Sequence, residues 1–187
     1  MWFQPRSFEV CGHFAFCDSN ILAMLQLALK LLRSMLSLQG AKTNMPWGHR
    51  PHPLLGLSCL CYGWPALVLF HYGMTWLGFV FVLQVVSSLL SDHVNTGCNS
   101  IWHIVDKWLA CSNTLHMIWY AADRVSPYVS LLAVIPLYCF YRAYRGSADK
   151  SYDQFVYWHI WWHITGGAIA SWVLHQSFVI AAEGVKV

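Results

Sequence analysis

Charge is scarce in this sequence: Asp, Glu, Lys and Arg make up only 10% of its 187 residues. Hydrophobic residues make up 57%, and the mean hydropathy is +0.45, whereas about a quarter of the residues of a soluble domain are charged. The Lys and Arg residues are scattered and form no basic cluster of the kind that binds nucleic acid. We therefore expect a protein that is solvated by the lipid bilayer and has no nucleic-acid partner.

Paired cysteine motifs are also missing. The seven cysteines include no CxxC pair and no spacing typical of a zinc ribbon or a disulfide framework, so we expect most of them to be small apolar packing residues. Residues 1–20 lack a sustained apolar stretch and do not resemble a cleaved signal peptide. The first spanning helix is therefore expected to direct membrane insertion.

Five apolar stretches are present, and each can cross a bilayer as a helix, which takes about 20 residues. They cover approximately residues 54–71, 76–90, 101–120, 128–144 and 152–182. The breaks between them are rich in Asn, Gly, Ser and Pro, and Ser151 or Asp153 is placed to cap the last helix. The sequence predicts an all-α fold, a multi-pass transmembrane helical bundle with about five spans.

Residues 21–38 form a different kind of segment. The polar positions from Gln26 to Ser37 fall on one stripe of a helix, opposite a broad leucine face. This pattern is typical of an amphipathic helix that lies in the membrane interface, and a true span is the alternative.

These segments divide the chain into three regions. Residues 1–53 form an N-terminal region with the interfacial helix and a linker that is rich in Gly and Pro. Residues 54–182 form the transmembrane bundle, and residues 183–187 form a short C-terminal tail.

The cations divide unevenly between the two sides that alternating spans define. Arg124 and Lys186 lie on one side, and nine cations lie on or near the other. These nine are Arg6, Lys30, Arg33, Lys42, Arg50, Lys107, Arg142, Arg145 and Lys150. Because cytoplasmic loops carry the excess of Lys and Arg, we expect the side with nine to be cytoplasmic. The sequence thus predicts an integral multi-pass protein of an endomembrane, such as the ER or Golgi, or of the plasma membrane.

Four ionisable residues lie inside apolar stretches, where such residues usually pair or serve a function. His93 ends the second predicted span, Asp106 lies early in the third, and His159 and His163 lie early in the fifth. Alternation puts all four at similar depth near the cytoplasmic side. His159 and His163 are four positions apart, so they share one helix face. With His93 as a third ligand they predict a metal site whose fourth position is open, as in catalytic zinc centres.

Asp106 completes the predicted chemistry. Zinc lowers the pKa of a bound water to about 7, and a nearby carboxylate such as Asp106 would accept the proton. The sequence therefore predicts a catalytic zinc centre on the cytoplasmic side.

Three segments of the chain resemble motifs of the CREST superfamily of membrane hydrolases, which includes alkaline ceramidases, progestin and adiponectin receptors, GPI-remodelling lipases and myomaker-like proteins. The family has a Ser and a His at the end of one helix, an Asp at the start of the next, and a late HxxxH preceded by aromatic residues. The matching segments here are SSLLSDH (87–93), WHIVDKW (102–108) and DQFVYWHIWWHITGGA (153–168).

The resemblance implies that His93, His159 and His163 bind zinc and that Asp106 holds or deprotonates the water. It further implies a membrane lipid as the substrate, cleaved at an amide or ester bond, with ceramide-like lipids first. The family's serine precedes its histidine by four positions, where this chain has Leu89.

Ser88 and Ser91 are therefore the two candidates for the catalytic serine. The family also commonly has seven spans, whereas the interval from Asp106 to His159 holds one complete helix in place of three. Omitting a pair of helices keeps the site on the same side of the membrane.

Two other functions fit the same sequence. A receptor or membrane-remodelling protein would hold the zinc ion as a structural element and cleave no lipid. A b-type haem electron carrier would use His103 with His116, and His163 with His175, because each pair places two ligands about 18 to 20 Å apart along one helix.

Overall fold

The computed structural model describes residues 45–184, and every regular element there is helical. Three helices are long and apolar enough to cross a membrane: Pro53–His71, Thr75–Val94 and Tyr152–Ala182. The predictions of an all-α fold and of a membrane protein are confirmed to this extent, and the total of five spans stays a prediction. The predicted interfacial helix at 21–38 lies outside the described residues.

The described helices begin and end within a few residues of the predicted stretches. In chain order they are α2 (Pro53–Cys59), the 3-10 turn η2 (Leu60–Tyr62), α3 (Gly63–His71), α4 (Thr75–Ser88), the π-helical turn η3 (Leu89–Val94), α5 (Trp102–Arg124), the 3-10 turn η4 (Val129–Ala133), α6 (Val134–Ala148) and α7 (Tyr152–Ala182). Ser151 is the residue before α7, as expected, although its side chain makes no capping hydrogen bond.

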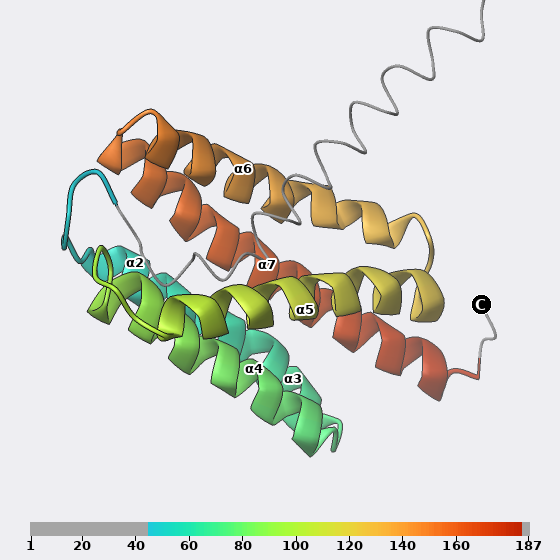
Figure 1. Ribbon diagram of the computed structural model, residues 1–187. Coiled ribbons are helices and arrows are strands. Elements are labelled where there is room, and N and C mark those ends of the chain that lie inside the picture. The colour runs from blue at the N-terminus through green and yellow to red at the C-terminus, as the bar shows by residue number, and fades with distance from the viewer. Residues whose placement is uncertain (1–44, 185–187) are drawn as a thin grey trace, which may run out of the picture. The chain divides into compact units, whose positions relative to one another are not determined.

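Helix α7 is the central element of the bundle (Figure 1). It packs against α2, α3, α5 and α6, while α4 packs against α3 and α5. Its 31 residues extend over about 46 Å, more than the ~30 Å of hydrocarbon in a bilayer. Elements that are far apart in the sequence therefore meet along one helix.

Helices α5 and α6 are more polar than the three candidate spans. The 23 residues of α5 are long enough to cross a bilayer, but charged residues lie near both of its ends, and two arginines lie near the end of α6. Both helices lie alongside the apolar ones (Figure 1). Their crossing of the membrane therefore stays a prediction.

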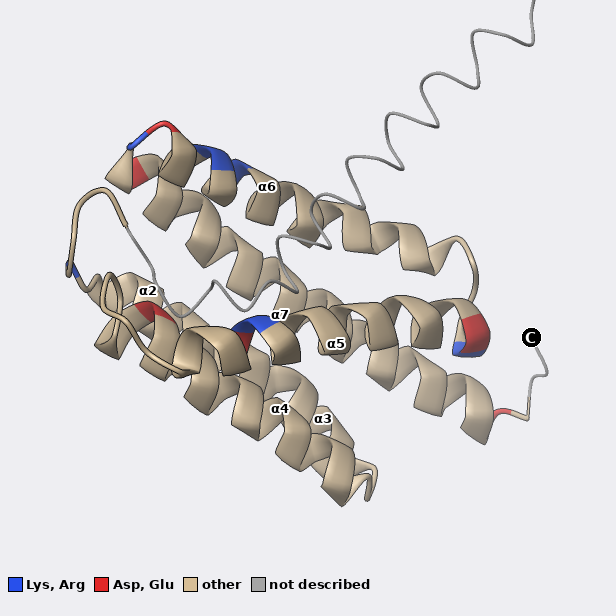
Figure 2. Ribbon diagram, in the orientation of Figure 1, with Lys and Arg blue, Asp and Glu red and all other residues tan. Residues whose placement is uncertain are grey.

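Four of the six cations among the described residues lie toward one end of the bundle, and Lys107 lies part-way along α5 (Figure 2). Arg50 precedes α2, Arg142 and Arg145 lie in the last turns of α6, and Lys150 follows them. At the opposite end Arg124 pairs with Asp123 at 2.9 Å. This distribution agrees with the charge asymmetry seen in the sequence.

The chain before α2 packs against the loop that follows the second candidate span. Nδ1 of His49 lies 2.7 Å from the backbone oxygen of Thr96. Gly97 has a φ of +73°, and a Cβ there would collide with the carbonyl group of Gly48. Residues 45–52 therefore pack onto the bundle.

Small residues let neighbouring helices approach one another closely. A Cβ added at Gly167 of α7 would collide with the backbone oxygen of Cys61, so η2 rests directly on the α7 backbone. A Cβ added at Gly56 of α2 would lie 2.8 Å from Cγ of His93. Such contacts are typical of helix packing in membranes, and they bring α2, η3 and α7 together.

Replacing Gly167 by Ala should destabilise the protein by about 1–3 kcal/mol, because the new methyl group forces η2 away from α7. The midpoint of thermal unfolding in detergent measures this effect. Gly166→Ala is the matched control, since its Cβ would meet neighbours only at 3.7 and 4.0 Å. Equal midpoints for the two variants would contradict the close contact.

Candidate metal centre

Asp92 faces the histidine pair of α7. Its Oδ2 lies 3.2 Å from Nε2 of His159 and 3.4 Å from Nε2 of His163. When zinc binds nitrogen and oxygen ligands tetrahedrally at ~2.0 Å, those ligands lie about 3.3 Å apart. Each of these two distances therefore matches the separation of two ligands of one metal ion.

Ser58 determines which nitrogen of His163 carries a proton. Its Oγ lies 2.7 Å from the backbone oxygen of Leu55 and 2.8 Å from Nδ1 of His163. The carbonyl group can only accept, so the Ser58 hydroxyl donates to Leu55, and Nδ1–H of His163 donates to Ser58. Nε2 of the neutral ring then presents a lone pair to the carboxylate of Asp92. Two acceptors face each other, and a cation between them makes this contact favourable.

Cys59 adds a sulfur atom to the same cluster. The potential ligand atoms of Cys59, Asp92 and His163 all lie within 4.8 Å of one another. The Cys59 side chain is fully buried, and its thiol donates to the backbone oxygen of Leu55 at 3.3 Å. This buried Cys/Asp/His cluster could hold a metal ion.

Ser91 and His103 hold the other oxygen of Asp92. The Ser91 hydroxyl donates to Oδ1 of Asp92 at 3.1 Å, and Nδ1 of His103 lies 2.8 Å from the same hydroxyl oxygen. Nε2 of His103 lies 2.8 Å from the backbone oxygen of Cys98. These contacts turn Oδ2 of Asp92 toward the histidines, and they place the predicted candidate Ser91 behind the carboxylate.

Asp106 lies in a second polar cluster between α4 and α5. The Ser88 hydroxyl donates to Oδ1 of Asp106. Nε2 of Gln84 lies 2.8 Å from the same oxygen and 2.9 Å from Oγ of Ser88. Two predicted site residues, Ser88 and Asp106, are thus brought together, and Gln84 is a partner that the sequence did not indicate.

His93 lies against Gly56 of α2, and its Nδ1 is buried without a hydrogen-bond partner. Asp92 makes the contacts with the α7 histidines that were expected for His93. Both residues lie in the π-helical turn η3, whose winding differs from that of an α-helix and sets which of the two side chains faces α7. The role of His93 as a ligand stays a prediction. The sequence did contain a signal for Asp92, because it follows Ser88 by four positions, the spacing of the CREST motif.

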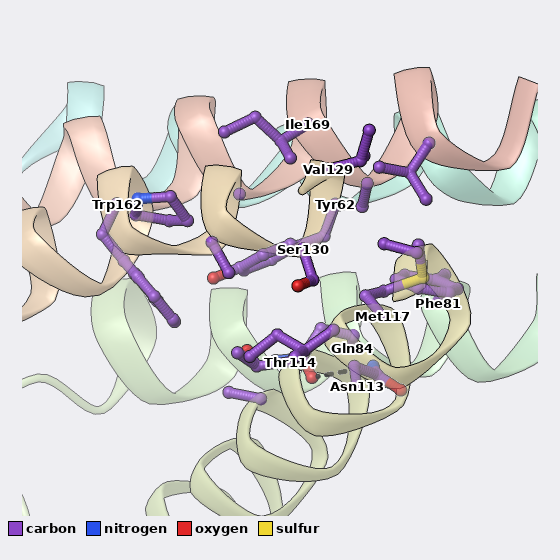
Figure 3. A pocket seen from close by; sticks show the side chains of 18 residues that line it. Tyr62, Phe81, Gln84, Asn113, Thr114, Met117, Val129, Ser130, Trp162 and Ile169 are labelled. Atoms are coloured by element: carbon purple, nitrogen blue, oxygen red, sulfur yellow. Dashed lines mark hydrogen bonds between the residues drawn. The ribbon is translucent and has the colours of Figure 1, made fainter. Parts of the chain in front are cut away.

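An apolar pocket adjoins both clusters, and Figure 3 shows the side chains that line it. Its cavity volume is about 70 Å³, below the range of ~300–1,000 Å³ for ligand pockets. Gln84 lines the pocket and also contacts Asp106. Tyr62 lines it as well, with its ring 5.1 Å from the ring of His163. A ligand in this pocket would therefore lie beside the two polar clusters.

Comparisons of the chain with protein-family models, curated proteins and solved structures find no significant match. The fold and the site themselves define the class: a helical membrane protein with a buried side-chain cluster that could hold a metal ion.

Proposed function

We propose that this protein is a zinc-dependent integral-membrane hydrolase that cleaves an amide or ester bond of a membrane lipid. The observation that carries the proposal is the convergence of one carboxylate oxygen and two imidazole nitrogens, from Asp92, His159 and His163, at 3.2 and 3.4 Å. Buried ionisable groups within membrane helices are costly and usually functional. Imidazole and carboxylate are ligands that zinc accepts.

The residues around the cluster have distinct roles in this proposal. Asp92, His159 and His163 would hold zinc, which when bound supplies a Lewis acid that polarises a carbonyl group and acidifies water. Asp106 is held by hydrogen bonds from Ser88 and Gln84, and it would accept the proton of the attacking water and pass it to the leaving group.

The substrate in this proposal is a lipid that reaches the site from within the membrane. The pocket beside the clusters is lined mainly by apolar side chains, so it suits a hydrocarbon chain, and ceramide-like lipids remain the first candidates. Five spans with the cation-rich end in the cytoplasm would place the site on the cytoplasmic side of an endomembrane or of the plasma membrane.

Cys59 favours a second candidate function. If its sulfur joins Asp92, His159 and His163, four protein ligands close the site, which is typical of structural zinc. The protein would then be a receptor or a membrane-remodelling protein that binds zinc without cleaving lipid. A haem is less well supported, because both ring nitrogens of His103 make contacts within the protein.

Removing the metal should abolish lipid turnover, and adding zinc back should restore it, because without zinc no group polarises the carbonyl. Elemental analysis of the purified protein and release of fatty acid from labelled ceramide measure the two quantities. The double variant His159→Ala, His163→Ala should lack the metal. His175→Ala is the matched control, since His175 lies on the same helix and contacts Tyr72 instead. Turnover that survives complete metal removal would refute the hydrolase proposal.

Cys59→Ser separates the two candidate functions. A catalytic site with three ligands keeps its metal and its turnover in this variant. A closed structural site loses metal in the variant, and the wild type then cleaves no lipid.

A further inference from the structure

The hydroxyl group of Tyr62 is buried without a partner. The side chain is only 8% exposed, and its oxygen makes no hydrogen bond. Burying a hydroxyl without a hydrogen-bond partner is unfavourable. Two other tyrosines differ: Tyr72 contacts Nδ1 of His175, and Tyr120 contacts Oγ of Ser177, both at 3.0 Å. Tyr62 thus has a hydrogen bond to offer to a ligand.

Tyr62 lies between the candidate metal centre and the pocket. Its ring contacts the ring of His163 in an edge-to-face arrangement, with 5.1 Å between the centroids. On the other side it lines the pocket near Gly166, where an added Cβ would lie 3.7 Å from the tyrosine ring (Figure 3). A ligand whose chain fills the pocket and whose reacting group lies near His163 must pass this side chain.

We propose that the Tyr62 hydroxyl donates a hydrogen bond to the carbonyl oxygen of the bond that is cleaved, an inference that rests on the proposed hydrolase function. During hydrolysis the water oxygen bonds to the carbonyl carbon, and an electron pair moves onto the carbonyl oxygen. This electron pair then re-forms the carbonyl double bond as the bond from the carbonyl carbon to the leaving nitrogen or oxygen breaks. The leaving group takes a proton from the water, and the acyl carbon keeps the hydroxyl. The hydrogen bond from Tyr62 strengthens while negative charge is on the carbonyl oxygen.

Tyr62→Phe should lower kcat by about 10²–10³-fold, the usual effect of removing one donor to a developing oxyanion, with little change in KM and none in zinc content. Tyr120→Phe is the matched control, because its hydroxyl contacts Ser177 and does not line the pocket. Wild-type kcat in Tyr62→Phe would overturn the inference while leaving the hydrolase function in place.

A binding measurement separates the two proposals. The probes are a long-chain methyl ketone, which keeps the carbonyl group, and the alkane of the same length. Tyr62→Phe should weaken ketone binding by about three- to tenfold, the value of one hydrogen bond, and leave alkane binding unchanged. If the wild type cleaves no lipid but this difference is found, the hydrolase function fails and the donor role of Tyr62 stands. Equal ketone binding in both proteins would overturn the donor role.

Discussion

Asp92→Ala is expected to abolish metal binding and lipid turnover together, whereas His93→Ala should retain both. Asp92 supplies the oxygen that lies 3.2 and 3.4 Å from the two histidine nitrogens, so its loss leaves only two imidazoles. Partners of metal ligands contribute about 10–100-fold to affinity or activity, and loss of a ligand should exceed that range. Zinc content and release of fatty acid from ceramide are the two measurements.

Two further variants sharpen this comparison. Asp92→Asn keeps the size of the side chain and its contact with Ser91 but removes the charge, so it should also lose zinc. Asp153→Ala removes a carboxylate in the first turn of α7, outside the cluster, and should behave as the wild type. Loss of zinc in His93→Ala, with zinc retained in Asp92→Ala, would instead establish three histidine ligands.

Asp106→Asn should lower turnover by about 10²–10⁴-fold, the usual contribution of a general base, with zinc content unchanged. The amide oxygen of Asn can still accept the hydrogen bonds from Ser88 and Gln84, so the local structure is kept while the capacity to accept a proton is lost. The rate of ceramide hydrolysis by the zinc-loaded variant measures the effect.

Asp123→Asn is the matched control for this experiment. Asp123 lies at the far end of the same helix, where it pairs with Arg124, and its loss should leave turnover unchanged. If Asp106→Asn lost zinc instead of rate, Asp106 would act on the metal centre rather than on the water.

The positions of the helices could be predicted because they depend on composition alone. Long apolar runs require helical backbone in lipid, and the predicted last segment, 152–182, coincides with α7. The pairing of Ser88 with Asp106 was also within reach, since both were singled out from their motifs. The exact ends of the helices and the direction in which each side chain faces depend on finer features of the sequence. For these the predictions agree less well with the structure.

Several site residues could not be found from the sequence. Ser58 and Tyr62 lie more than 100 positions before His163, and they reach it only because Gly167 lets η2 rest on α7. Cys59 was expected to be a packing residue, and nothing in its neighbourhood in the sequence distinguishes it from one. Contacts of this kind depend on tertiary packing, which local patterns do not specify.

The six-residue turn η3 is where the helix departs from the α-helical period. Removing Leu90 would shorten the interval after Ser88 by one residue and let the backbone return to regular α-helical winding. A π-helical turn absorbs one extra residue locally within an α-helix, so Asp92 and His93 should keep their present facing in the shortened chain. The extra residue therefore changes the winding of this turn, while the anionic side chain, and with it the negative charge that a bound cation would meet, stays directed at α7.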